Sequence, residues 1–251
     1  MAAEPQIVVR ANLEEVSGEA AARFRLLAAD NIASAGRFSV ALSGGSTPRA
    51  LYRLLAEPPF GEAIDWRRVH LFWGDERFVP PDHPDSNYRL AREAFISRVP
   101  IPAANVHPIP TEGGDPEATA AQYEETLRHF FATPEGEMPH FDLILLGMGA
   151  EGHTASLFPG SPALDEHDRL VVATYIPKLG AWRLTLTPPV LRCARHVLFL
   201  VSGLDKASAL REVLEGPYDP RRLPAQVARP DKGDLTWLAD GAAASLLHQR
   251  G

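Results

Sequence analysis

The stretch Phe141-Asp-Leu-Ile-Leu-Leu-Gly-Met-Gly-Ala-Glu-Gly-His-Thr-Ala-Ser-Leu-Phe-Pro-Gly160 predicts the fold class and the place of the chemistry. Residues 141–146 form a short apolar run with one Asp, which is typical of a parallel strand buried on both faces. The glycines that follow let the backbone turn sharply and approach a ligand. Glu151 and His153 stand at the end of this turn. Ligands of open α/β sheets bind beyond the carboxyl ends of strands, so we expect this pair to lie at a functional site.

Similar apolar runs with turn residues after them recur along the chain. They predict strands at residues 38–42, 69–73, 170–175, 182–187 and 196–201, with shorter ones at 225–228 and 235–238. Helical patterns cover residues 12–35, 47–56, 86–97, 118–131, a segment ending near 214, and 241–248. This order predicts a single α/β domain over residues 1–251, Rossmann-like and doubly wound, with a mostly parallel twisted sheet flanked by helices.

Composition limits the class of protein. The formal net charge of −7 argues against nonspecific nucleic-acid binding, and it means that an anionic substrate needs a local cationic pocket. The one cysteine, Cys193, excludes an intramolecular disulfide and fits a reducing cytosol. The N-terminal residues do not resemble a signal peptide, and no apolar run reaches the roughly 18–20 residues that span a bilayer. We therefore expect a cytoplasmic protein that acts on a small molecule, without membrane or nucleic-acid partners.

The turn after the strand at 38–42 is rich in small polar residues. It reads Ser43, Gly44, Gly45, Ser46, Thr47 and Pro48. Backbone N–H groups that lead into a helix N-terminus form an anion site, and the three hydroxyls add donors. It is not a P-loop, because the Gly-Lys-Ser/Thr ending is absent. The turn therefore predicts either a phosphate or sugar site or an ordinary strand-to-helix connection.

Two further turns carry charge. Asp75 and Arg77 follow the strand at 69–73, where acids and a guanidinium can hold sugar hydroxyls and a phosphate, although a surface salt bridge is the commoner explanation. Lys206 follows the strand at 196–201, and it is either a phosphate ligand or a solvated lysine. With the turns after the strands at 38–42 and 141–146, four glycine-containing turns follow four strands, and we expect them at one edge of the sheet.

The turn before His153 formally matches Gly-x-Gly-x-x-Gly over residues 147–152. A dinucleotide site needs a long helix next, and Pro159 would break it, so we do not expect a dinucleotide oxidoreductase. The chain has no His-Glu-x-x-His, no Cys-x-x-Cys and no Gly-x-Ser-x-Gly, so neither zinc nor a serine nucleophile is indicated. His153 is then a candidate general base or acid, and Glu151 is close enough either to orient it or to form a hydrogen bond with a ligand.

Taken together, these motifs resemble the glucosamine-6-phosphate isomerase/6-phosphogluconolactonase superfamily and, within it, the 6-phosphogluconolactonase family. The resemblance covers nearly the whole chain. It rests on residues 41–48, 73–77, 85–88, 147–160 and 183–187, and on Gly203 with Lys206. It implies hydrolysis of 6-phospho-D-glucono-1,5-lactone to 6-phosphogluconate in the oxidative pentose phosphate pathway, without metal or organic cofactor, by a monomer or small homo-oligomer.

The resemblance also implies roles for single residues. His153 activates water with Glu151 beside it, Arg77 and Lys206 hold the phosphate, and the turn Ser43–Thr47 lines the pocket. Asp75, Gly152 and Arg183 are expected as further contacts. The chain departs from the family pattern at Glu151, where Asp is usual, and in residues 188–192, where an asparagine is expected.

The sequence allows two rival functions, an enzyme on the same fold and a binding domain from another class. An amino-sugar-phosphate isomerase/deaminase would read Ile-Ala-Phe-Asn-Glu-Pro after Gly-His, but here the segment is Thr-Ala-Ser-Leu-Phe-Pro, and Leu157 and Phe158 replace the Asn-Glu pair that aids ring opening. A non-catalytic sugar-phosphate-binding domain of a regulator would not need His153, and such regulators carry a DNA-binding module that this sequence does not indicate.

Overall fold

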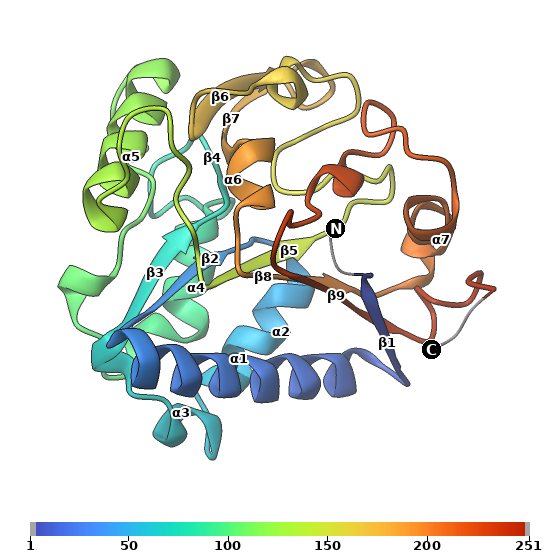
Figure 1. Ribbon diagram of the computed structural model, residues 1–251, viewed down its shortest axis with the longest axis horizontal. Coiled ribbons are helices and arrows are strands. Elements are labelled where there is room, and N and C mark those ends of the chain that lie inside the picture. The colour runs from blue at the N-terminus through green and yellow to red at the C-terminus, as the bar shows by residue number, and fades with distance from the viewer. Residues whose placement is uncertain (1–3, 249–251) are drawn as a thin grey trace.

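The computed structural model describes residues 4–248 and has a central six-stranded sheet between layers of helices (Figure 1). Every strand pair in this sheet is parallel, and the order is β1-β9-β8-β5-β2-β3. Its strands are β1 (Gln6–Arg10), β2 (Phe38–Leu42), β3 (Val69–Trp73), β5 (Leu143–Gly147), β8 (His196–Val201) and β9 (Asp234–Asp240). The predicted α/β fold with a mostly parallel, helix-flanked sheet is confirmed.

Helices cover both faces of the sheet. The α-helices of the described residues are α1 (Leu13–Ala35), α2 (Ser46–Leu55), α3 (Phe60–Ala63), α4 (Asn87–Ala94), α5 (Pro116–Phe131), α6 (Pro188–Arg192) and α7 (Ala207–Glu215). Helices α1 and α2 lie on one face, and α5 and α6 lie on the other (Figure 1). Asn12 caps α1 by accepting a hydrogen bond from the Glu15 N–H at 3.0 Å, and Gly36 ends the helix at φ 75°. Within residues 4–248, no helix is long and apolar enough to cross a membrane.

The two central strands, β2 and β5, pair over a short stretch, which leaves residues 145–147 of β5 beyond the pairing. Only Val40↔Leu143 and Ala41↔Ile144 are in register. Below them, Asp142 Oδ2 accepts hydrogen bonds from the backbone N–H and the hydroxyl of Ser39, at 2.8 and 2.7 Å. This buried contact explains the single Asp in the apolar run. Because the pairing stops at Ala41 and Ile144, room remains for a ligand where β2 and β5 end.

The order of the strands also reverses between β2 and β5. From β2 the chain proceeds outward to β3, whereas from β5 it proceeds the other way, to β8 and β9. Ligands of doubly wound folds bind at such a switch point, outside the carboxyl ends of the strands. The four glycine-containing turns follow β2, β3, β5 and β8, which are neighbours in the sheet. The expectation that these turns share one edge therefore agrees with the topology.

A second, antiparallel sheet of three strands was not predicted. It consists of β4 (Asp75–Arg77), β7 (Ala181–Leu186) and β6 (Val171–Ile176), in that order. The sequence indicated a turn for residues 74–77, but these residues continue into a strand because their backbone pairs with β7. The strands predicted at 170–175 and 182–187 exist, and they belong to this smaller sheet rather than to the parallel one.

Other local predictions need correction. Strand β1 was missed, and it pairs with β9 at the edge of the sheet. Residues 225–228 are not a strand, since a 3-10 turn spans Pro224–Val227 and its proline lacks a ladder donor. Residues 241–248 form turns rather than a helix. The helix predicted at 47–56 is α2, which begins one residue earlier, at Ser46 after Gly45.

A cluster of aromatic side chains encloses two histidines near the amino end of β3. His70 Nδ1 lies 3.4 Å from His107 Nε2, and Phe72 stacks on His107 with ring centroids 4.5 Å apart. Burial lowers the pKa of His70 to about 4, and the neighbouring His107 and Arg37 add to this shift. Burial also lowers the pKa of His107. Both imidazoles are therefore favoured in the neutral form when the protein is folded.

These histidines predict a loss of stability in acid. In the unfolded chain a histidine titrates near about 6.5, so between this pH and about 4 the unfolded state binds more protons than the folded state. The free energy of unfolding should fall as the pH is lowered through this window, and it should fall less steeply in His70→Phe. Urea unfolding at several pH values measures this, with the exposed His167→Gln as the control. An unchanged slope in His70→Phe would contradict the explanation.

Candidate active site

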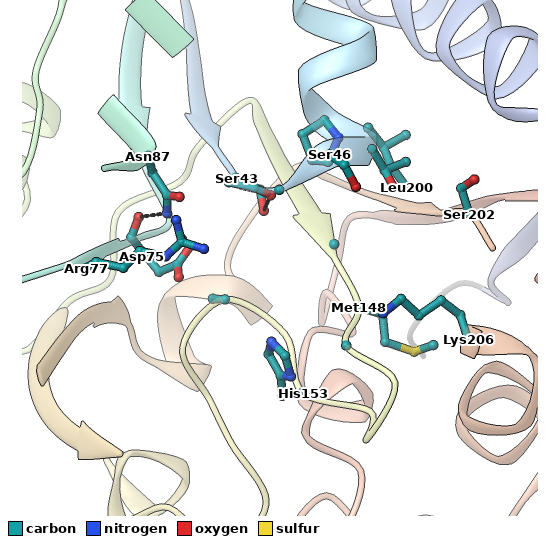
Figure 2. A pocket seen from close by; sticks show the side chains of 17 residues that line it. Ser43, Ser46, Asp75, Arg77, Asn87, Met148, His153, Leu200, Ser202 and Lys206 are labelled. Carbon is teal, nitrogen blue, oxygen red and sulfur yellow. Dashed lines mark hydrogen bonds between the residues drawn. The ribbon is translucent and has the colours of Figure 1, made fainter. Parts of the chain in front are cut away.

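A cleft of about 230 Å³ lies at the switch point of the parallel sheet (Figure 2). Segments that follow β2, β5 and β8 line it, together with β4 and the start of α4. The lining residues are Ser43, Gly44, Gly45, Ser46, Thr47, Pro48, Asp75, Arg77, Asn87, Gly147, Met148, Gly149, His153, Ala155, Leu200, Ser202 and Lys206. The cleft thus combines a polar turn, carboxylate and imidazole groups, and two cationic side chains.

The turn between β2 and α2 presents backbone donors to the cleft. The hydroxyl of Tyr52 donates to Ser43 O at 2.7 Å and accepts from Ser43 N–H at 3.0 Å, which fixes the start of the turn. Gly45 has a φ of 105°, which favours glycine, and it precedes the first residue of α2. Within the described residues no side chain caps this helix. Its first N–H groups, at Ser46 and Thr47, are therefore available to an anion at the positive end of the helix dipole.

Gly44 is needed for a different reason, which is close packing. A Cβ at this position would lie 1.8 Å from Asn87 Oδ1. Any larger residue would therefore push the turn away from α4 or displace Asn87. The glycine lets the turn and the N-terminus of α4 approach each other across the cleft wall.

The loop after β5 folds back on itself and carries His153. Gly149 N–H donates to His153 O at 2.9 Å, and Gly152 N–H donates to Gly149 O at 3.0 Å. The imidazole of His153 stacks on the ring of Phe158, with centroids 4.2 Å apart and planes 16° from parallel. A Cβ on Gly149 would lie 2.0 Å from His153 Nδ1. The ring is thus held between Phe158 and a backbone segment that only glycine permits.

Glu151 lies beside the inner nitrogen of this imidazole. Its Oε2 is 3.3 Å from His153 Nδ1, and its Oε1 is 3.5 Å from Lys178 Nζ. Burial lowers the pKa of His153 below its ordinary value, Lys206 adds to this effect, and the carboxylates of Glu151 and Asp75 oppose it. Because His153 lines the cleft and its Nδ1 is buried near Glu151, we expect Nε2 to be the nitrogen that is open to a ligand. A neutral imidazole in this orientation can accept a proton from a bound water.

Strand β4 supplies the other wall of the cleft. The buried Asp75 and the half-buried Arg77 both line it, and Arg77 Nη1 donates to Asp85 O at 2.6 Å. Arg183 stands opposite Arg77 in the antiparallel pair of β4 and β7. Burial lowers the pKa of Arg183, and the charge of Arg77 lowers it further. Two adjacent guanidiniums at this wall favour an electron-rich ligand group.

Lys206 enters the cleft from the turn after β8. Asp240, at the end of β9, supports this turn: its Oδ2 accepts from Ser202 Oγ at 2.5 Å, and both its oxygens lie 3.2 Å from Gly203 N. Lys206 Nζ is 2.9 Å from the exposed carboxylate of Asp205. Figure 2 shows Lys206 and Arg77 on opposite sides of the cleft, with His153 between them.

Most of the residues that the sequence singled out are brought together here. Those that line the cleft are Ser43, Gly44, Gly45, Ser46, Thr47, Asp75, Arg77, His153 and Lys206. Glu151, Gly152 and Arg183 stand behind this lining. Glu151 contacts the imidazole, Gly152 turns the loop at φ 80°, and Arg183 lies next to Arg77.

Sequence reasoning missed several residues of the lining. Asn87 is the most informative of them, because it is buried and polar. It lies within residues 85–88, one of the stretches that resemble the family, but nothing local in the sequence places the first residue of α4 beside β4. Met148, Ala155 and Leu200 are apolar lining residues that carry no sequence signal for a site.

The described residues offer no obvious metal site. Within residues 4–248, no group of three or more His, Cys, Asp or Glu side chains is arranged to hold a metal ion. The chemistry available to this cleft from its own side chains is proton transfer at His153, hydrogen bonding at Asp75 and at the turn before α2, and charge stabilisation at Arg77 and Lys206.

Comparison with known proteins adds a family to this geometry. Residues 11–237 match the family described as glucosamine-6-phosphate isomerases/6-phosphogluconolactonase. A 6-phosphogluconolactonase from Synechocystis sp. is 50% identical over 216 residues, which cover 86% of this chain and 87% of the relative.

Solved structures show the same fold. The 6-phosphogluconolactonase from Trypanosoma cruzi has a TM-score of 0.89 at 34% sequence identity, with 99% of both chains covered. A monomeric glucosamine-6-phosphate deaminase has a TM-score of 0.78 at 25% identity, and 96% of this chain and 99% of that chain are covered. The fold is therefore common to both activities, and the site has to distinguish them.

Proposed function

This chain belongs to the glucosamine-6-phosphate isomerase/6-phosphogluconolactonase family, and we propose that it is a 6-phosphogluconolactonase, which hydrolyses 6-phospho-D-glucono-1,5-lactone to 6-phospho-D-gluconate. One observation of the structure carries the proposal. His153 lines a cleft that has Lys206 on one side and Asp75 with Arg77 on the other, and the turn of backbone donors before α2 lines the same cleft. A phosphorylated, hydroxyl-rich lactone matches these groups in charge and polarity.

In the proposed mechanism His153 is first a base and then an acid. Nε2 accepts a proton from water while the water oxygen bonds to the lactone carbonyl carbon, which gives a tetrahedral intermediate. The bond between this carbon and the ring oxygen then breaks, and the ring oxygen takes the proton from the imidazolium. Glu151, 3.3 Å from Nδ1, orients the ring and stabilises its charged form.

The two cations of the cleft have different proposed roles. The family resemblance implies that Arg77 and Lys206 hold the phosphate, and Figure 2 shows these two side chains on opposite sides of the cleft. We assign the phosphate to Lys206 and the first N–H groups of α2, where a full charge meets a helix N-terminus. Arg77, beside Asp75, then faces the lactone end of the substrate, where it stabilises negative charge that develops on the carbonyl oxygen.

The deaminase alternative is disfavoured by the surroundings of His153. The acid of the deaminase pattern is replaced here by Phe158, whose ring stacks on the imidazole at 4.2 Å. An apolar ring in this position desolvates the base and supplies no proton for ring opening.

The expected setting of the enzyme is part of the same proposal. A single cysteine and a net charge of −7 fit a cytoplasmic enzyme acting on a free sugar phosphate, as a monomer or small homo-oligomer.

The direct test is lactone hydrolysis by the purified protein. We expect turnover of 6-phosphogluconolactone above the spontaneous rate, and equal turnover after treatment with a chelator, because no metal-ligand cluster accompanies the site within residues 4–248. The assay couples 6-phosphogluconate formation to its dehydrogenase and subtracts the uncatalysed opening. Absence of turnover rejects the proposal, and a loss on chelation that metal restores rejects the cofactor-free mechanism.

His153→Ala should lower kcat by about 10²- to 10⁴-fold, because it removes the base, while 6-phosphogluconate still binds.

The pH dependence of the wild-type enzyme gives a second test of the same base. Since burial lowers the pKa of His153, the neutral base persists in weak acid, and the fall of kcat/KM on the acid side of its pH profile should lie below about pH 6.5. Glu151→Gln removes a charge that raises this pKa, so it should move this fall to still lower pH. The pH profile of kcat/KM locates this fall in the wild type and in Glu151→Gln. For His153→Ala, calorimetry measures the binding of 6-phosphogluconate, and a near-normal kcat would exclude this residue as the base.

Lys206→Met and Arg77→Met should separate the two cations. Loss of Lys206 should raise KM and the inhibition constant of inorganic phosphate about tenfold or more, since a charge-assisted contact is lost. Loss of Arg77 should mainly lower kcat and leave phosphate inhibition within about twofold. Lys232→Met, at an exposed lysine outside the cleft, is the matched control. An equal rise in the inhibition constant of inorganic phosphate in both variants would show that Arg77 also contacts the phosphate.

A further inference from the structure

Asp75 is a buried carboxylate that two uncharged side chains hold. Its Oδ2 accepts a hydrogen bond from Ser156 Oγ at 2.8 Å. Its Oδ1 lies 3.4 Å from Asn87 Nδ2, which also donates to the backbone oxygen of Asp75 at 2.9 Å (Figure 2). Asp75 is 7% exposed and lines the cleft. A carboxylate has about four acceptor positions, so these two donors leave others for a ligand.

The two donors are themselves immobilised. Asn87 is 2% exposed, and its backbone N–H donates to Glu76 Oε1 at 2.7 Å. Its amide cannot turn over without pointing an oxygen at the oxygens of Asp75. Ser156 is 1% exposed, and its backbone N–H lies 3.3 Å from Thr185 Oγ1 on β7. Neither donor is a flexible surface group, so the contacts constrain the rotamer of Asp75.

These contacts also join segments that are remote in sequence. Ser156 is three residues after His153 in the same loop and 81 residues from Asp75. Asn87 begins α4, whereas Asp75 begins β4. The Ser156 hydroxyl is therefore a direct link between the loop that carries the imidazole and the strand that carries Asp75 and Arg77.

We infer that Asn87 and Ser156 are positioning residues, which hold the Asp75 carboxylate toward a hydroxyl of the substrate and keep it in register with His153. This inference rests on the proposed function, because the hydroxyl belongs to the sugar lactone. Two fixed donors leave Asp75 no freedom to rotate away, and its remaining lone pairs accept a substrate O–H at one place. Small errors of placement in such a site are costly, up to about 10²-fold for a shift of about 1 Å.

The test is a double-mutant cycle on binding and turnover. Ser156→Ala removes only the donor, and Asp75→Ala removes the group through which it acts. With Asp75 present, Ser156→Ala should raise the dissociation constant of 6-phosphogluconate, measured by calorimetry, about threefold or more and lower kcat about tenfold. In the Asp75→Ala background the same change should alter the dissociation constant less than about twofold. Asn87→Ala provides a second, independent arm of the cycle.

A matched control comes from the same loop. Ser161 is buried, and its hydroxyl pairs with Thr174 Oγ1 at 3.1 Å, away from the cleft. Ser161→Ala should leave kcat and product affinity within about twofold, although it loses a comparable hydrogen bond. Thermal unfolding of every variant confirms that the folded fraction is the same.

Each outcome decides a different question. Equal losses from Ser156→Ala with and without Asp75 would overturn the positioning role, and so would an Asp75→Ala variant with normal affinity and turnover. A wild-type protein that neither hydrolyses the lactone nor binds 6-phosphogluconate would instead reject the proposed function, and the positioning inference would fall with it. An effect of Ser156→Ala that occurs only when Asp75 is present would support both the positioning role and the proposed function.

Discussion

The site depends on how far β2 and β5 stay together. The buried contact between Asp142 and Ser39 and two register pairs hold the start of β5 against β2, and the pairing then stops at Ala41 and Ile144. A parallel sheet that stayed paired to the ends of these strands would close the crevice at the switch point. Because the strands end without pairing, the turn after β2 and the loop after β5 lie across an opening instead of against each other. The cleft is thus a consequence of where backbone pairing ends.

Two glycines let the walls of this opening approach each other closely. At Gly44 and Gly149 a single methyl group would collide with Asn87 and His153, at 1.8 and 2.0 Å. Both contacts join a backbone segment to a side chain that lines the cleft. Such close approach lowers the freedom of the imidazole and the amide before any substrate arrives, so less order has to be created on binding.

The sequence predicted the parallel sheet and most of the cleft because strand–turn–helix signals are local. Turns after β2, β5 and β8 can be placed from apolar runs and glycines alone, and so can Ser43, His153 and Lys206. The smaller sheet was not predictable in this way. Strand β4 has three residues and pairs with β7 more than 100 residues later, so no local pattern reveals it. Asn87 was missed for the same reason, since its role depends on where β4 lies.

The charges of the cleft show how an acidic protein accommodates an anion. Asp75 and Glu151 lie near His153, and a third carboxylate, Glu76, is buried behind Asp75. Burial raises the pKa of Glu76 to about 7, while backbone N–H groups at the start of α4 lower it. Its four donors come from Arg77, Ser86, Asn87 and Tyr88. This carboxylate therefore acts on the protein rather than on the substrate: it holds the segment that supplies Asn87. The proposed phosphate position lies at Lys206, which pairs with the exposed Asp205, and at the N-terminus of α2. In this proposed binding mode the phosphate is remote from Asp75 and Glu151, so that binding energy at one end can fix the position of the carbonyl at the other, which is the way that a remote group contributes to kcat.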